Sequence, residues 1–155
     1  MKTIARSLLP LVALAAASVA APASADQTVT AVGVEFDPMV VYVEPGESVT
    51  WTQMNAHNVE TLADLIPEGG VEFNSEVGAD YSQKFDEPGI FVYKCTPHWG
   101  ARMGGIVVVG KPEDAGATMD AYLATIDEKR GDLLPAKGLI KKGRKDMEEQ
   151  GLVQP

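Results

Sequence analysis

One cysteine, two histidines and a methionine have the residue types and spacing of a single metal site. Cys95 is the only cysteine in the chain, and His57 and His98 are its only histidines. His98 follows Cys95 with two residues between them, and Met103 follows His98 with four between them. A thiolate, two imidazoles and a thioether are the donors of a mononuclear copper site with a weak axial methionine. The expected copper ligands are His57, Cys95, His98 and Met103.

This mixture of donors suits a metal that changes its charge. Sulfur ligands favour Cu(I), whereas imidazole accepts both oxidation states of copper. A site that compromises between the two states needs little rearrangement when an electron enters or leaves. The pattern therefore predicts one copper ion per chain that cycles between Cu(II) and Cu(I).

Each of these residues also has an ordinary interpretation. A free cysteine is often a small buried hydrophobic residue, and most methionines lie in cores. The chain contains six methionines, so Met103 alone carries little information. Zinc accepts cysteine and histidine as well, and copper is preferred here because of the methionine.

A series of short strands is expected to position the ligands. Runs rich in β-branched and aromatic residues are separated by Pro/Gly turns, which is typical of an antiparallel sandwich or barrel. Cys95 ends one strand, Met103 precedes the next, and His57 follows a strand, so the ligands can meet at one end of the sheets. The predicted strands are residues 28–36, 39–43, 48–52, 81–85, 90–95 and 105–109, and residues 64–79 are predicted to form a loop with one helical turn.

Two helices are expected after the last strand. Met119, Tyr122, Leu123 and Ile126 form an apolar stripe at helical spacing in a helix that opens near Pro112. A second helix is expected at residues 139–149, interrupted by Gly143. Isolated helices of this length are marginal in water, so both are predicted to pack on the sandwich.

The N-terminal residues have the features of a secretory signal peptide. Lys2 and Arg6 precede an apolar run at residues 8–17, and Ala23-Ser24-Ala25 provides a cleavage site. The run is shorter than the roughly 20 residues that span a bilayer. We therefore expect a signal peptide at residues 1–25, a sandwich at 26–110 and a helical extension at 111–155. After cleavage of the signal peptide, the protein is expected to be soluble in the periplasm, without membrane insertion.

The charge of the chain disfavours nucleic acid as a partner. The formal net charge is −9, and residues 26–110 contain thirteen acidic but only three basic side chains. Such a surface repels phosphate backbones. Lys94 and Arg102 are the only basic residues near the predicted ligands in sequence.

Three segments carry a resemblance to a known family: Cys95-Thr96-Pro97-His98-Trp99-Gly100-Ala101-Arg102-Met103, His57-Asn58-Val59-Glu60 and Pro45-Gly46-Glu47-Ser48-Val49-Thr50. They resemble segments of pseudoazurins, which are type 1 blue-copper proteins of the cupredoxin group. Amicyanins have a shorter loop between the histidine and methionine ligands, and plastocyanins lack the C-terminal extension. The resemblance implies a mainly β, cupredoxin-like Greek-key sandwich with a C-terminal pair of α-helices.

The resemblance also implies roles for residues around the ligands. The backbone N–H of Asn58 would point at the Cys95 sulfur, and Pro97 would deny that sulfur a second donor. The sequence departs from the family in the ligand loop, where Trp99 stands in place of the common tyrosine and Ala101-Arg102 replaces a Met-Gly pair. It also has almost none of the lysines that surround the site in pseudoazurins that serve acidic reductases. An apolar patch for electron exchange would surround the edge of His98, with Pro97, Trp99, Ala101 and Ile66-Pro67 as candidate members.

The expected function is that of a monomeric periplasmic one-electron carrier. By resemblance, its partners would be a nitrite or nitrous oxide reductase, a dehydrogenase or a cytochrome c. An enzyme is not expected, because a second copper centre needs further histidines and the chain has only two. The alternative is a protein that stores or delivers copper, which retention of the metal through a redox cycle would distinguish.

Overall fold

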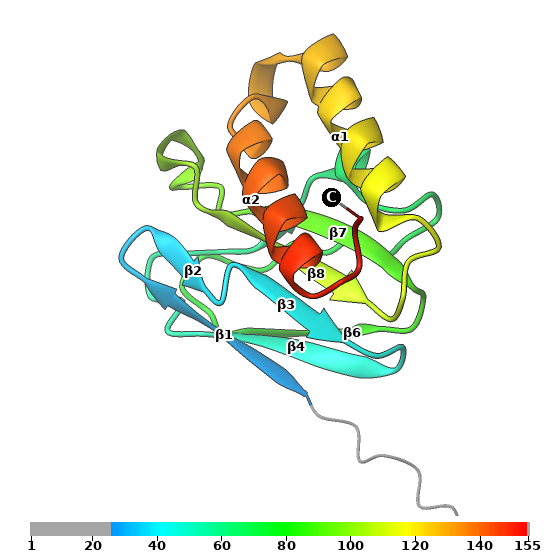
Figure 1. The fold of residues 1–155 in the computed structure, drawn as a ribbon. Coiled ribbons are helices and arrows are strands. Elements are labelled where there is room, and N and C mark those ends of the chain that lie inside the picture. The colour runs from blue at the N-terminus through cyan, green and yellow to red at the C-terminus, as the bar shows by residue number, and fades with distance from the viewer. Residues whose placement is uncertain (1–25, 155) are drawn as a thin grey trace, which may run out of the picture.

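Two four-stranded sheets pack face to face, and a pair of helices covers the outer side of one of them (Figure 1). The computed structural model describes residues 26–154, so the predicted signal peptide lies outside the described residues. The sheets have the orders β2-β1-β4-β6 and β3-β8-β7-β5. The strands are β1 (Gln27–Val32), β2 (Glu35–Asp37), β3 (Val40–Val43), β4 (Glu47–Thr52), β5 (Glu60–Thr61), β6 (Tyr81–Phe85), β7 (Gly89–Lys94) and β8 (Gly104–Val109).

Both sheets are mixed, so the expectation of purely antiparallel strands is wrong. β1 is parallel to β4, and β3 is parallel to β8, whereas the other strand pairs are antiparallel. The chain crosses to the second sheet between β2 and β3 and returns with β4, which then runs alongside β1 in the same direction. Such pairings between strands that are not consecutive in the chain depend on long-range packing that local sequence patterns do not specify.

The single strand predicted at residues 28–36 is a tight hairpin. Val32 pairs with Glu35, and Gly33 between them has a φ of 61°. Residues other than glycine rarely adopt this backbone conformation, so Gly33 allows the chain to reverse direction there. The predicted loop at residues 64–79 contains one 3-10 turn at its start, η1 (Ala63–Leu65).

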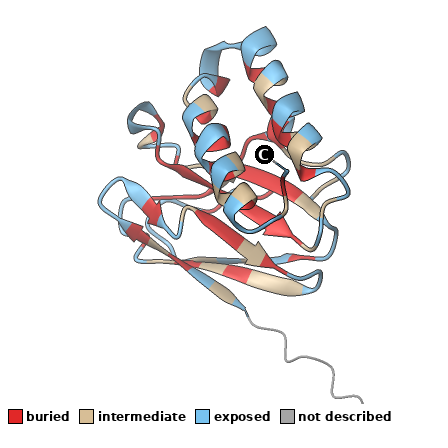
Figure 2. Cartoon of the chain, viewed as in Figure 1, coloured by how far each residue is buried: buried red, intermediate tan, exposed pale blue. Residues whose placement is uncertain are grey.

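β8 is buried on both faces, as its continuous apolar sequence predicts. Val107 and Val109 lie in the core between the two sheets, and Ile106 and Val108 lie in a second core beneath the helices. Buried residues run through the strands of both sheets and along the side of the helices that faces the sheet (Figure 2). Two stacked cores therefore hold three layers together.

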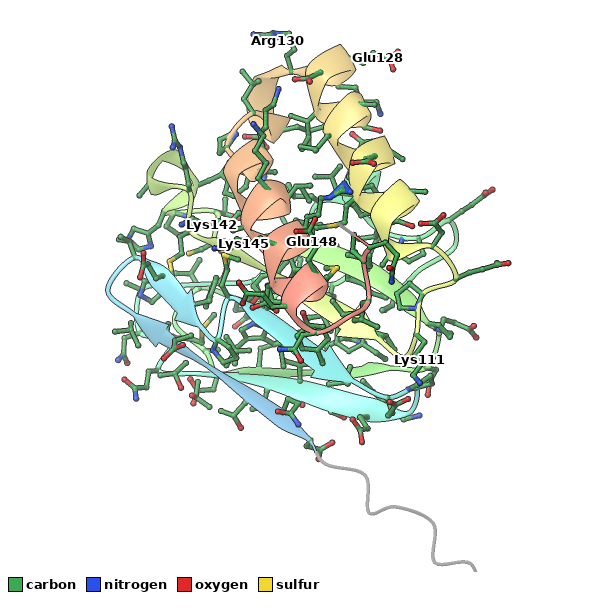
Figure 3. All side chains as sticks on the ribbon, in the orientation of Figure 1. Lys111, Glu128, Arg130, Lys142, Lys145 and Glu148 are labelled. Atoms are coloured by element: carbon green, nitrogen blue, oxygen red, sulfur yellow. The ribbon has the colours of Figure 1, made fainter. Side chains whose placement is uncertain are left out.

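The C-terminal helices are α1 (Ala115–Lys129) and α2 (Ala136–Glu149), joined through the 3-10 turn η3 (Gly131–Leu133). The carboxylate of Asp114 caps α1 by accepting a hydrogen bond from the Ala117 N–H at 2.8 Å, so the helix begins three residues after Pro112. Figure 3 shows Glu128 and Arg130 pointing away from the sheets at the outer end of the pair. The predicted apolar stripe is confirmed, since Met119, Tyr122 and Ile126 are buried and Leu123 is partly buried.

α2 begins before residue 139 and continues through Gly143 without interruption. A Cβ atom at Gly143 would lie 2.3 Å from the Cδ1 atom of Ile106 on β8. Glycine is therefore present at this position because the helix backbone approaches the sheet closely, and not because the helix breaks. None of the helices in residues 26–154 is long and apolar enough to cross a bilayer.

We expect Gly143→Ala to lower the free energy of unfolding by up to about 2 kcal/mol. Overpacking costs about 1–3 kcal/mol, which outweighs the roughly 1 kcal/mol by which alanine favours a helix over glycine. Denaturant unfolding of residues 26–155 measures this change. Gly138 in the same helix is the matched control, because a Cβ atom there meets nothing within 4 Å. Gly138→Ala should raise the stability by about 0.5–1 kcal/mol, and equal effects of the two substitutions would contradict the packing argument.

Candidate metal centre

The loop between β7 and β8 carries three of the four predicted ligands. Cys95 follows the last residue of β7, and Met103 precedes the first residue of β8. Between them the chain forms a 3-10 turn, η2 (Trp99–Ala101), which begins directly after His98. The Cys95 N–H donates to the Met103 carbonyl at 2.8 Å and extends the β7–β8 ladder by one pair. Both ends of the loop are therefore fixed to a rigid hairpin.

His57 reaches the same place from the loop after β4. Its N–H donates to the Met54 carbonyl at 2.9 Å, and its own carbonyl accepts from Gly78 at 3.0 Å. Met54 is held in turn, because its N–H donates to the Asp80 carboxylate at 3.1 Å. A network of backbone hydrogen bonds thus presents the His57 imidazole to Cys95.

The structure brings His57, Cys95 and His98 together. The Cys95 Sγ atom lies 3.6 Å from Nδ1 of His57 and 3.5 Å from Nδ1 of His98. The three donor atoms lie within 4.8 Å of one another. A metal bonded to nitrogen at about 2.0–2.1 Å and to sulfur at about 2.3 Å, with trigonal angles, would separate S from N by about 3.7 Å. The observed distances therefore fit one ion bound by all three residues.

Met103 lies beside this group. Its N–H donates to the His98 carbonyl at 3.3 Å, and its carbonyl accepts from Cys95. The side chain is buried in the same core cluster as Cys95. Met103 is thus tied by its backbone to two of the three donor residues. Its thioether would supply the weak fourth donor that the copper site of this type has.

The centre is closed to solvent except on one side. Cys95 is fully buried, Met103 is 1% exposed and His57 is 9% exposed, whereas His98 is half-buried. Burial lowers the pKa of His57, and the neighbouring His98 lowers it further. A lowered pKa keeps the His57 imidazole neutral near pH 7, and the neutral form is the one that binds a metal.

Asn58 connects the two segments that supply the ligands. Its side-chain oxygen accepts from the Thr96 N–H at 2.7 Å, and its amide nitrogen donates to the Thr96 hydroxyl at 3.2 Å. The Thr96 hydroxyl donates to the Glu60 carboxylate at 2.6 Å. The expectation that the backbone N–H of Asn58 points at the Cys95 sulfur is not tested by these contacts and stays a prediction. The contribution of its side chain, and that of Thr96, was not foreseen.

Three residues predicted for the apolar patch around His98, namely Trp99, Ile66 and Pro67, do not lie on the surface beside it. Trp99 is only 6% exposed, and its ring packs with the C-terminal helices instead of facing solvent. Ile66-Pro67 lies at the other end of β7, because Pro67 contacts Gly89 at the start of this strand while Cys95 follows its end. Pro97 and Ala101 are exposed beside His98. The resemblance implies a surface position for Trp99, but burial of its large apolar ring is more favourable.

The basic residues near the centre are few, and one of them is already paired. Lys94 forms ion pairs with Asp132 at 2.8 Å and with Glu60 at 3.9 Å. Arg102 is exposed and lines a groove between the ligand loop and α2. Lys142 of α2, which Figure 3 labels, lines the same groove. The surface near His98 therefore has no ring of free lysines among the described residues.

Comparison with known proteins decides the family. The sequence profile of copper binding proteins of the plastocyanin/azurin family matches residues 23–110. The chain belongs to this family. Within it, the chain is a cupredoxin of the pseudoazurin type, which confirms the resemblance seen in the ligand loop.

The match to this cupredoxin covers a different share of each relative. Pseudoazurin of Paracoccus pantotrophus is 35% identical over 106 residues, which cover 59% of this chain and 73% of that protein. A putative pseudoazurin of Rhizobium leguminosarum bv. viciae is 43% identical over 76 residues, 48% of this chain and 50% of that protein. The chain therefore spans about three quarters of one relative and half of the other.

A solved structure supports the same fold. The crystal structure of pseudoazurin from Methylobacterium extorquens AM1 superposes with a TM-score of 0.59 and 29% identity, covering 75% of this chain and 99% of that one. The predicted fold, a sandwich with two C-terminal helices, is thus confirmed. Copper is the metal of this family, and the pseudoazurin-type cupredoxin is an electron carrier and not an enzyme.

Proposed function

We propose that this cupredoxin is a periplasmic one-electron carrier that holds one copper ion through His57, Cys95, His98 and Met103. The observation that carries the proposal is the approach of the Cys95 sulfur to both histidines, at 3.6 and 3.5 Å, at a largely buried centre whose most exposed member is His98. A carrier needs a metal that stays bound and one short path for electrons. This arrangement supplies both.

Each residue around the metal has its own role in the proposed electron transfer. A copper ion bound there would accept and release one electron. The buried Cys95, His57 and Met103 exclude water from the metal, so few solvent molecules must reorient when the charge changes. Asn58 ties the His57 segment to the ligand loop through its bond to the Thr96 N–H. His98, with Pro97 and Ala101 beside it, offers the contact edge for a partner.

The surface charge suggests the chemistry of that partner. The carboxylates of Glu60, Asp64, Glu72 and Asp132 line a hollow next to the ligand loop, together with Lys94, which is paired. Opposite charges steer association, and like charges oppose it. We therefore propose a basic or weakly charged docking face on the partner. A cytochrome c or dehydrogenase as donor and a nitrite or nitrous oxide reductase as acceptor remain the proposed classes.

The proposed site of action is the periplasm. Residues 1–25 would be removed as a signal peptide, leaving the sandwich at 26–110 and the helical extension at 111–155 as one monomeric unit. The composition of residues 1–25 supports export. Mass spectrometry of the protein from the periplasmic fraction would test the cleavage after Ala25, and a monomer mass on a sizing column would test the oligomeric state.

The first experiment is a copper and redox titration of residues 26–155. Addition of Cu(II) should produce an intense thiolate-to-copper band in the visible spectrum, with one copper per chain. A one-electron reductant should bleach the band, and reoxidation should restore it without loss of metal. Absence of the band in folded protein would refute the proposal. Release of the metal on reduction would instead favour copper storage or delivery, the alternative function.

Methionine substitutions test the proposed axial ligand. We expect Met103→Leu to change the visible spectrum and the reduction potential of the copper protein, because the axial ligand tunes the potential of such sites. Met54→Leu is the matched control. Met54 is a methionine buried in the same core and hydrogen-bonded to His57 through its backbone, but it is not a proposed ligand. Voltammetry that gives the same potential for both variants would exclude Met103 as a ligand.

A further inference from the structure

We propose that the turn between the two C-terminal helices positions the metal-binding loop through two hydrogen bonds of Asp132. The inference rests on the proposed function, because it takes Cys95 and His98 as metal ligands. It assigns the helical extension a part in the site. Trp99 and Asp132 are then positioning residues, since neither offers a donor atom to the metal.

The first bond holds the residue after His98. The indole Nε1–H of Trp99 donates to the backbone carbonyl of Asp132 at 2.7 Å. The Trp99 ring is nearly buried and belongs to the core cluster beneath the helices, together with Leu133 and Leu139. This bond therefore joins the ligand loop to an element that follows it by more than thirty residues.

The second bond holds the residue before Cys95. The ammonium group of Lys94 donates to the Asp132 carboxylate at 2.8 Å, and the Lys94 side chain is only 12% exposed. Lys94 ends β7, and Cys95 comes next. One residue of the helical extension thus contacts both the residue before the thiolate and the residue after the imidazole.

The loop needs such external support on this side. Within the loop, the His98 carbonyl accepts from Ala101 at 3.0 Å and from Met103 at 3.3 Å, and further bonds join other backbone groups. Asn58 fixes the first half of the loop by binding the Thr96 N–H. For the second half, the described residues offer the Trp99 indole as the side-chain anchor. Without it, the backbone beside His98 would be held by turn hydrogen bonds alone.

The Trp99 ring also has little room to move. A Cβ atom at Gly104 would lie 3.2 Å from the Cζ3 atom of Trp99 and 2.7 Å from the Cδ1 atom of Leu139. Glycine at the start of β8 therefore makes space for the ring and for α2. The close packing of α2 on β8 at Gly143 keeps the whole helical pair in this position. The packing of Trp99 and α2 on β8 therefore limits the movement of the loop.

The test compares two Trp→Phe substitutions. Trp99→Phe removes the indole donor, while Trp51→Phe makes the same truncation at a buried site. Trp51 is fully buried, and among residues 26–154 its Nε1–H makes no hydrogen bond to the ligand loop. The first readout is amide hydrogen exchange of residues 98–103 in the metal-free protein. The second is the rate at which a chelator removes Cu(II) from the loaded protein.

We expect Trp99→Phe to accelerate both processes about fivefold, the factor that corresponds to one ordinary hydrogen bond. Trp51→Phe should leave both rates unchanged even if it lowers the overall stability. Unchanged rates in Trp99→Phe, or the same acceleration in Trp51→Phe, would overturn the inference. If the wild type forms no thiolate-to-copper band, the proposed function fails, but the exchange of the metal-free protein still decides whether Trp99 restrains the loop.

A second variant covers the possibility that Trp99→Phe does not fold. Asp132 is exposed, and Asp132→Asn keeps its size while weakening the bond with Lys94. We expect this variant to fold and to lose copper to the chelator about twofold faster, as for a partly exposed ion pair. Asp120→Asn, which alters an ion pair between the helices far from the loop in sequence, is the control and should leave the rate unchanged. Equal rates in all three proteins would contradict a role for the Asp132 carboxylate.

Discussion

The Cys95→Ser protein is expected to fold but to show no thiolate-to-copper band and to bind Cu(II) more than a hundredfold more weakly. The Cys95 sulfur is the atom that lies next to both histidine nitrogens. Serine supplies a neutral hydroxyl, which is a poor replacement for a soft thiolate ligand. Even changes to groups that only support metal ligands cost about 10–100-fold in affinity, so loss of a ligand should cost more.

Chelator competition followed in the visible spectrum measures this loss, and circular dichroism checks the fold. A buried hydroxyl in place of the thiol costs about 1–3 kcal/mol of stability at most, because the nearby imidazoles can accept its hydrogen bond. Ser75→Ala, which removes a buried hydroxyl that binds the Val59 N–H, is a control for stability. It should destabilise the fold to a similar extent and keep the band. A Cys95→Ser protein that retains the band would refute the ligand assignment.

The second large effect is expected at Asn58. Replacement of its buried side chain by alanine removes both hydrogen bonds to Thr96 and separates the His57 segment from the ligand loop. We expect Asn58→Ala to lower copper affinity by about 10–100-fold, the usual cost of losing a residue that orients metal ligands. The stability should fall by about 1–3 kcal/mol, because the Thr96 N–H loses its acceptor.

Copper competition and denaturant unfolding of the same preparations test this expectation. Asn55→Ala is the matched control, since Asn55 lies in the same loop but its side chain is exposed. It should leave both quantities within measurement error. If Asn58→Ala bound copper as tightly as Asn55→Ala, the hydrogen bonds between the two ligand segments would have no role in holding the metal.

The acidic character of the chain distinguishes its proposed partners from those of lysine-rich pseudoazurins. Electron transfer with a basic cytochrome should slow as salt is added, because screening weakens attraction between exposed charges. The ion pairs of Lys94 strengthen this view. Lys94 is one of the two basic residues near the ligands in sequence. Because its charge is already paired with Asp132 and Glu60, it is less available to a partner.

The sequence by itself determined the ligand types, the family and most of the elements. Cys95, His98 and Met103 are close in sequence on a loop between two strands, so their meeting follows from the local hairpin. The strand at Tyr81–Phe85 and the apolar stripe of α1 follow from short periodic patterns. These features depend on neighbours within a few residues, which is why one sequence suffices to predict them.

Only the tertiary structure decided how distant segments meet. The parallel pairing of β1 with β4, the place of Pro67 at the far end of β7 and the burial of Trp99 all depend on packing between elements. The bond from Trp99 to Asp132 joins residues 33 positions apart and leaves no pattern in the sequence. Such contacts are chosen by the packing of whole layers and by the need to satisfy buried polar groups, and neither is encoded in a local run of residues.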